Sequence, residues 1–75
     1  MQGELRQHLL GEIKTATGEH WQEVIDIPAI HPDMSKLIHI VLVNSTHAQT
    51  SEGEHVELDQ LDTDTLIQVT DDLII

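Results

Sequence analysis

The sequence predicts a small α+β fold, in which an N-terminal helix packs on an antiparallel sheet of three or four strands. Three observations indicate this class. Apolar residues recur at helical spacing near the N-terminus, residues 37–43 form an apolar β-branched run, and polar turn-forming segments separate the other short apolar stretches. The chain has 75 residues, so we expect a single domain over residues 1–75.

The first predicted element is an amphipathic helix over residues 3–16. Its apolar positions recur every three or four residues and are Leu5, Leu9, Leu10 and Ile13. Gly18 follows the last helical residues and is placed to adopt the left-handed conformation that commonly caps a helix C-terminus. We therefore expect this helix to cover one face of the sheet.

Residues 19–27 allow two interpretations. The alternation from Trp21 to Ile27 is typical of a strand, which Pro28 would end. A short helix over residues 19–25 is the alternative. The next segment, up to Lys36, holds two prolines and is expected to be an irregular crossing.

Residues 37–43 (LIHIVLV) form the clearest predicted strand. The run is apolar on both faces and rich in β-branched residues, which favours a central position in the sheet. His39 interrupts the run, and an imidazole in the middle of a strand must find a hydrogen-bond partner or face the solvent.

The second half of the chain predicts further strands separated by polar segments. Residues 44–53 are expected to form a turn-rich loop, residues 55–58 a short strand and residues 65–70 another strand. The apolar end, residues 73–75, is expected to be able to add an edge strand to a neighbouring molecule.

The core is expected to be small and aliphatic. Trp21 is the only aromatic residue, so we expect leucine, isoleucine and valine to pack around it. The absence of cysteine excludes disulfides and thiolate zinc sites. A core this lean makes self-association a further prediction.

Charge is the most informative feature of the composition. Fourteen carboxylates face three cations, which are Arg6, Lys14 and Lys36. Residues 1–36 carry six acids and three bases, a net charge of −3, and residues 37–75 carry eight acids and no base, a net charge of −8. Direct binding of nucleic acid or of anionic membranes is disfavoured. A basic protein surface is the matching partner, although negative charge also serves solubility.

Metal, cofactor and catalytic sites are not expected. Histidines 31, 39, 47 and 55 are eight residues apart, whereas two metal ligands on one element are usually two or four apart. Asp59, Asp62 and Asp64 lack the glycine and the distal glutamate of a calcium-binding loop. No serine lies in a nucleophile elbow, and a chain with so little core has scant material for an enclosed active site. We therefore expect a non-enzymatic protein.

The acidic residues form the remaining candidate site. Several occur two positions apart, and on a strand this spacing would place both carboxylates on one face, about 6.5–6.8 Å apart. Such rows can imitate the charge of a nucleic-acid backbone, whereas a solvated outer face is the alternative for each pair. The candidate partner-binding residues are Asp26, Glu52, Glu54, Glu57, Asp59, Asp62 and Asp64.

Residues 9–20 (LLGEIKTATGEH), 23–27 (EVIDI) and 36–43 (KLIHIVLV) resemble the small acidic phage inhibitors of uracil-DNA glycosylase. Members of that family have an N-terminal helix ending on Thr-Gly, an acidic segment and carboxylate-rich antiparallel strands. They bind the enzyme through an acid on the first strand and an apolar pocket between helix and sheet. The resemblance covers roughly half the chain. Asp26 lies one position off the family's register, PAIHPDM replaces the second helix, and the tail aromatics are missing. The resemblance implies a class, acidic inhibitors, and transfers no functional residue.

Three functions follow as expectations. The first is an inhibitor that occupies the basic nucleic-acid-binding cleft of a host enzyme. The second is a structural or assembly subunit of a virion or another oligomer, and the third is an acidic antitoxin-like regulator. The N-terminus lacks an apolar signal region and residues 37–43 are too short to span a bilayer, so the expected compartment is the cytoplasm.

Overall fold

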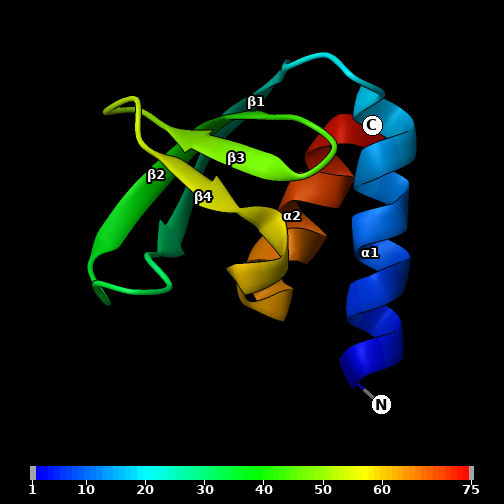
Figure 1. Cartoon of the computed structure of the whole chain (residues 1–75), viewed down its shortest axis with the longest axis horizontal. Coiled ribbons are helices and arrows are strands. Elements are labelled where there is room, and N and C mark those ends of the chain that lie inside the picture. The colour runs from blue at the N-terminus through cyan, green and yellow to red at the C-terminus, as the bar shows by residue number, and fades with distance from the viewer. Residues whose placement is uncertain (1, 75) are drawn as a thin grey trace.

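Two helices pack on one face of a four-stranded antiparallel sheet, which confirms the predicted α+β fold (Figure 1). The computed structural model describes residues 2–74, except for the side chain of Gln2. The strands follow one another across the sheet in the order β1-β2-β3-β4. The elements are α1 (Gln2–Thr17), β1 (Gln22–Ile30), β2 (Leu37–Val43), β3 (His47–Thr50), β4 (His55–Glu57), the 3₁₀ turn η1 (Leu58–Gln60) and α2 (Thr63–Ile74).

Helix α1 confirms the prediction for residues 3–16. Leu9 and Ile13 are buried in the core, as their helical spacing requires. Gly18 has a φ of +59° and its N–H donates a hydrogen bond to the Lys14 carbonyl at 2.9 Å. The predicted left-handed cap is therefore present.

Strand β1 settles the alternatives for residues 19–27 in favour of the strand. The expectation that Pro28 ends it is wrong, because β1 continues to Ile30 and Pro28 pairs with His39 of β2. β1 lies at an edge of the sheet, where a proline without an N–H is tolerated. A bulge lies between Glu23 and Ile27, where β1 is longer than the part of β2 it faces.

Helix α2 covers the bulge of edge strand β1. The Ile25 N–H within the bulge donates a hydrogen bond of 3.0 Å to Oδ2 of Asp72, which lies on α2. An edge strand with free N–H groups is a template for unwanted pairing, so this contact satisfies one such group and fixes the helix against the sheet.

Strand β2 confirms the predicted central strand. It lies between β1 and β3, and Ile38, Ile40 and Val43 are buried beneath the helices. His39 points to the opposite face and is half-buried, with its Nδ1 2.9 Å from Oδ1 of Asp26. The strand-centre imidazole therefore has the partner that its position requires.

Strand β3 lies inside the segment expected to be a loop, residues 44–53. Oδ1 of Asn44 accepts hydrogen bonds from the N–H groups of Thr46 and His47, which closes a tight turn after β2. Oγ1 of Thr50 accepts bonds from two N–H groups of the following turn in the same way. These side chains close the turns on either side of β3, a strand of four residues whose only buried apolar side chain is Ala48.

Helix α2 replaces the strand predicted for residues 65–70 and includes Leu73 and Ile74 of the segment expected to add an edge strand to a neighbour. Both predictions are wrong within the described residues; Ile75 lies outside them. Leu66, Val69 and Leu73 are spaced three or four residues apart, and they face the core. This helical period outweighs the strand propensity of threonine, isoleucine and valine in the segment.

The core is aliphatic, and the expectation that it surrounds Trp21 is wrong. Trp21 lies outside the core and is 40% exposed. The largest fully buried side chains come from α1, β2, η1 and α2 and from the connection between the last two, and they are Ile13, Ile40, Val43, Leu58, Leu61, Leu66 and Val69. Between residues 2 and 74 no helix combines the length and the apolar character needed to cross a bilayer.

Candidate partner-binding groove

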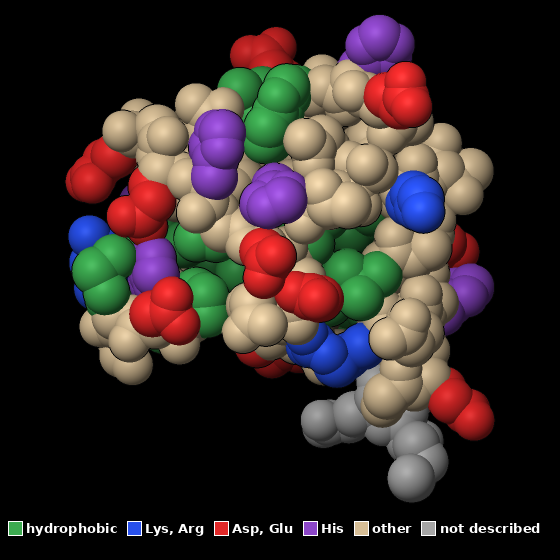
Figure 2. Space-filling model, viewed as in Figure 1, with side chains coloured by type: hydrophobic (Ala, Val, Ile, Leu, Met, Phe, Trp, Pro, Cys, Tyr) green, Lys and Arg blue, Asp and Glu red, His purple; other side chains and the backbone are tan. Residues whose placement is uncertain are grey.

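The seven acidic candidates lie on different elements, and only Asp26 and Glu57 are on strands. Glu52 and Glu54 lie in the β3–β4 connection and Asp59 lies in η1. Asp62 directly precedes α2, and Asp64 is in the first turn of that helix. The spacing of two residues therefore does not produce rows of carboxylates on the sheet. Figure 2 shows acidic side chains dispersed over one face of the molecule, with histidines among them.

Three of these acids are used within the fold. Asp26 binds His39, as described above. Oδ1 of Asp62 accepts a hydrogen bond from the Thr65 hydroxyl in the first turn of α2. Oε1 of Glu54 lies 2.6 Å from Nε2 of the buried His31.

The His31–Glu54 contact is short rather than well aligned. Glu54 Oε1 is buried and has no hydrogen bond of regular geometry, so the imidazole is the polar group that compensates it. Nδ1 of His31 accepts the N–H groups of Asp33 and Met34 at 3.0 and 3.1 Å. The ring hydrogen must then lie on Nε2, facing Glu54.

Every close contact between a carboxylate and a basic side chain among residues 2–74 involves a histidine: His8 with Glu12, His31 with Glu54, and His39 with Asp26. Arg6 instead donates hydrogen bonds to the Asp59 carbonyl at 2.7 Å and to the Thr63 hydroxyl at 3.4 Å. The permanent cations of the described chain thus leave the acidic surface without direct Lys or Arg pairing.

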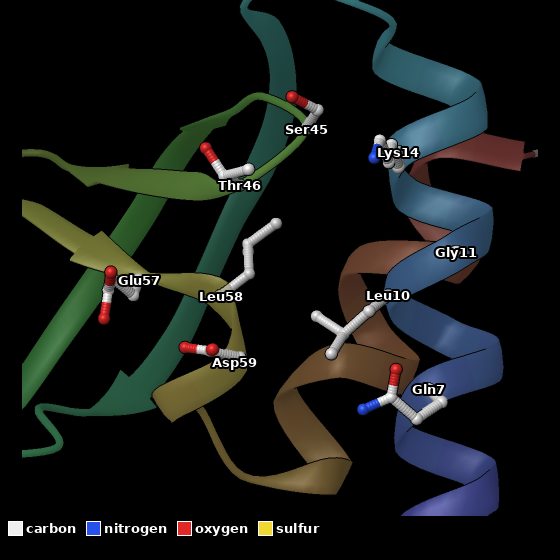
Figure 3. Close-up of a pocket in the computed structure, with 9 residues that line it drawn as sticks. All are labelled: Gln7, Leu10, Gly11, Lys14, Ser45, Thr46, Glu57, Leu58 and Asp59. Atoms are coloured by element: carbon white, nitrogen blue, oxygen red, sulfur yellow. The ribbon is translucent and has the colours of Figure 1, made fainter.

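A groove of about 380 Å³ separates α1 from the β4–η1 segment (Figure 3). The helix contributes one wall, the turn between β2 and β3 closes one end, and β4 with η1 forms the other wall. The lining residues are Gln7, Leu10, Gly11, Lys14, Ser45, Thr46, Glu57, Leu58 and Asp59.

The groove combines an apolar interior with charged edges. Leu10 extends from the helix toward η1 (Figure 3), and Leu58 on the opposite wall is buried. Glu57 and Asp59 are exposed on the β4–η1 side, and Lys14 lies on the helix side. We call Glu57 and Asp59 the acidic rim.

Gly11 widens the groove on the helix side. A Cβ atom at Gly11 would meet no heavy atom within 4 Å, so the space beside the helix backbone is open. The sequence pattern gave no direct signal for this groove, because its walls come from segments far apart in the chain. A glycine inside a predicted helix, next to an apolar position, is the one feature that could have suggested it.

The acidic rim borders the face of the sheet that points away from the helices. Glu57 pairs with His47 across β3–β4, and His55 lies two residues earlier on the same face of β4. The His55 ring contacts Trp21, with 5.3 Å between the ring centroids and 42° between the planes. The sequence prediction missed this cluster because it placed Trp21 in the core.

The histidines and carboxylates of the described residues do not gather into a metal-binding cluster. No three His, Asp or Glu side chains of residues 2–74 are grouped so that they could hold a metal ion. The eight-residue spacing places histidines on β2, β3 and β4, but at different levels of the sheet, as the register of the strand pairs requires.

No protein-family model matches this sequence, and neither a curated protein nor a solved structure matches it.

Proposed function

We propose that this protein is a non-enzymatic binding module that recognises a basic surface of another protein through the groove and its acidic rim. One observation carries the proposal. Glu57 and Asp59 are exposed beside an apolar groove, and neither forms an ion pair with a Lys or Arg of the described chain.

The apolar interior and the acidic rim of the groove contribute to partner recognition in different ways. The half-buried Leu10 offers apolar surface in the groove, which favours burial of a partner side chain. The rim carboxylates favour a cationic partner, steer its approach and disfavour an anionic one. The net charge of −11 acts in the same direction over longer distances.

The basic surface that fits best is one that normally binds nucleic acid, because such surfaces concentrate Lys and Arg. An inhibitor of a nucleic-acid-processing enzyme would use the groove in this way. An antitoxin-like regulator would use the same contacts on a different target. The proposal keeps the cytoplasm as the compartment, which cell fractionation would test.

Affinity capture with a charge-matched control tests the proposal. The bait proteins are the wild type, the rim variant Glu57→Gln/Asp59→Asn, and the control Asp33→Asn/Asp71→Asn, which removes two exposed carboxylates outside the groove. A partner should bind the wild type and the control at low salt, bind the rim variant more weakly, and be released as salt rises. A partner held equally by all three proteins would contradict the role of the groove.

Assembly with neighbouring subunits is a second proposal, favoured by a separate apolar surface. Ile30 and Leu37 pair across β1–β2 and are 55% and 60% exposed, and Met34 in the adjoining turn is 50% exposed. Exposed apolar residues in contact mark interaction surfaces in small proteins. Sedimentation of the wild type and of Ile30→Thr/Leu37→Thr at high concentration tests this. A strictly monomeric wild type would contradict self-assembly.

A further inference from the structure

The exposed ring of Trp21 is the starting point. In a chain with one aromatic residue and a lean core, burying that ring would contribute more apolar area than burying any other side chain. The fold instead leaves it 40% exposed, in contact with His55. Exposed tryptophan is enriched at sites that dominate the energy of protein interfaces.

Exposed carboxylates lie on either side of Trp21 in the sequence, Glu19 two residues before it and Glu23 two residues after it. Trp21 directly precedes β1, and Glu23 is the second residue of that strand. The alternation of an extended backbone favours the same side for Trp21 and Glu23. An aromatic face beside carboxylates is attractive to a cation, because the ring quadrupole and the negative charges act together.

The ring also lies next to the acidic rim. His55, which touches Trp21, and Glu57 are two residues apart on the exposed face of β4, a separation of about 6.5–6.8 Å. Trp21, His55 and Glu57 therefore form a continuous surface that leads into the groove. An extended peptide with two cationic residues near each other can reach both the ring and the rim.

We infer that Trp21 receives an arginine side chain of the basic partner, stacked on the indole and paired with Glu23, while a neighbouring cation of the same segment binds the acidic rim. This inference rests on the proposed function, since it names the chemistry by which the partner is recognised. Arginine fits better than lysine, because its planar guanidinium stacks on an aromatic ring and pairs with a carboxylate in two parallel hydrogen bonds.

Titration with hexa-arginine tests the inference directly. The chain has one tryptophan and no tyrosine, so tryptophan fluorescence and the indole N–H resonance report on Trp21 alone. At low salt, hexa-arginine should shift the indole resonance saturably and bind more tightly than hexa-lysine of equal charge. Equal affinity for the two peptides would overturn the inference, as would the absence of binding or an unchanged indole resonance.

Two variants measure the contribution of the ring by calorimetry. Trp21→Leu should weaken hexa-arginine binding roughly two- to fivefold, the effect of an exposed cation–π contact, and Trp21→Phe should weaken it less. Trp21 is outside the core, so both variants should keep the wild-type circular dichroism. Glu23→Gln, which leaves the ring intact, should also weaken hexa-arginine binding. If both Glu23→Gln and Trp21→Leu bound hexa-arginine with wild-type affinity, the inference would be overturned.

The two proposals fail in different ways. A partner lost from Glu57→Gln/Asp59→Asn but bound normally by Trp21→Leu would leave the groove proposal intact and overturn the role of Trp21. A partner lost only from Trp21→Leu would support the ring contact and contradict the role of the acidic rim.

Discussion

His31 Nε2 lies 2.6 Å from Glu54 Oε1, and this contact joins the segment after β1 to the connection between β3 and β4. The imidazole is buried, with a side-chain exposure of 7%, whereas the Glu54 side chain is 41% exposed. Nδ1 accepts two backbone N–H groups, which fixes the ring orientation. One polar contact therefore joins the β1–β2 connection to the β3–β4 connection.

Glu54→Ala should lower the free energy of unfolding by about 1–3 kcal/mol, because it leaves the buried Nε2–H of His31 without a partner. Glu52→Ala is the matched control in the same connection, where the side chain is exposed, and should change stability by less than about 0.5 kcal/mol. Urea unfolding of the two variants measures the difference. Equal stabilities would contradict the role of the contact.

The tautomer of His31 is a separate prediction. The hydrogen-bond pattern requires a hydrogen on Nε2 and none on Nδ1. Nitrogen chemical shifts of the imidazole distinguish the two forms. A ring with its hydrogen on Nδ1 would show that the two backbone N–H groups are bound in another way.

Arg6 should stabilise the fold by joining α1 to the η1–α2 junction. Arg6→Gln removes the bonds to the Asp59 carbonyl and the Thr63 hydroxyl and should cost about 0.5–1.5 kcal/mol. Lys14→Gln, which removes a cation that makes no ion pair in the described chain, should cost less. Thermal unfolding compares the two, and a larger loss for Lys14→Gln would contradict this assignment.

Asp62 should act in the structure of α2 rather than in partner binding. It precedes the helix, its carbonyl accepts the Leu66 N–H at 3.1 Å, and its carboxylate accepts the Thr65 hydroxyl. Asp62→Ala should cost about 1 kcal/mol, and Asp62→Asn, which keeps an acceptor, should cost less. Denaturant midpoints test this order, and both variants should bind the partner like the wild type.

The parts of the fold that the sequence predicts correctly are those with a clear local periodicity of apolar residues. Helix α1 and strand β2 carry unambiguous periodicity, and both are confirmed. Residues 65–70 form a short apolar run rich in β-branched residues, and this composition predicts a strand. The helical spacing of Leu66, Val69 and Leu73 is the weaker signal in the sequence, although it determines the structure. Strand β3 is short and polar, and it forms because the side chains of Asn44 and Thr50 close the turns on either side.

The candidate site was predictable only in part. Sequence analysis selected Glu57 and Asp59 with five other acids, because charge is visible in composition. What distinguishes these two residues from the other five acids is contacts such as that of His31 with Glu54, which join residues distant in the sequence. The exposure of Trp21 could not be anticipated, because an aromatic residue in an aliphatic chain is expected in the core.

Gly11 allows the groove to be blocked without a change in charge. Gly11→Ala should stabilise α1 by about 1 kcal/mol, since alanine is the better helix former and the added Cβ meets no neighbour. Gly11→Leu should fill the groove while keeping the fold, and it should weaken partner binding. Gly3→Ala, a helix substitution outside the groove that also has open space, is the control and should leave binding unchanged.

The salt dependence of partner affinity in these groove variants tests whether the groove recognises the partner. We expect Gly11→Leu to lower affinity at every salt concentration by a similar factor, because it removes shape rather than charge. Glu57→Gln/Asp59→Asn should lower affinity mainly at low salt and flatten its dependence on salt, since fewer charges remain to be screened. Wild-type affinity and salt dependence in both variants would contradict recognition through the groove.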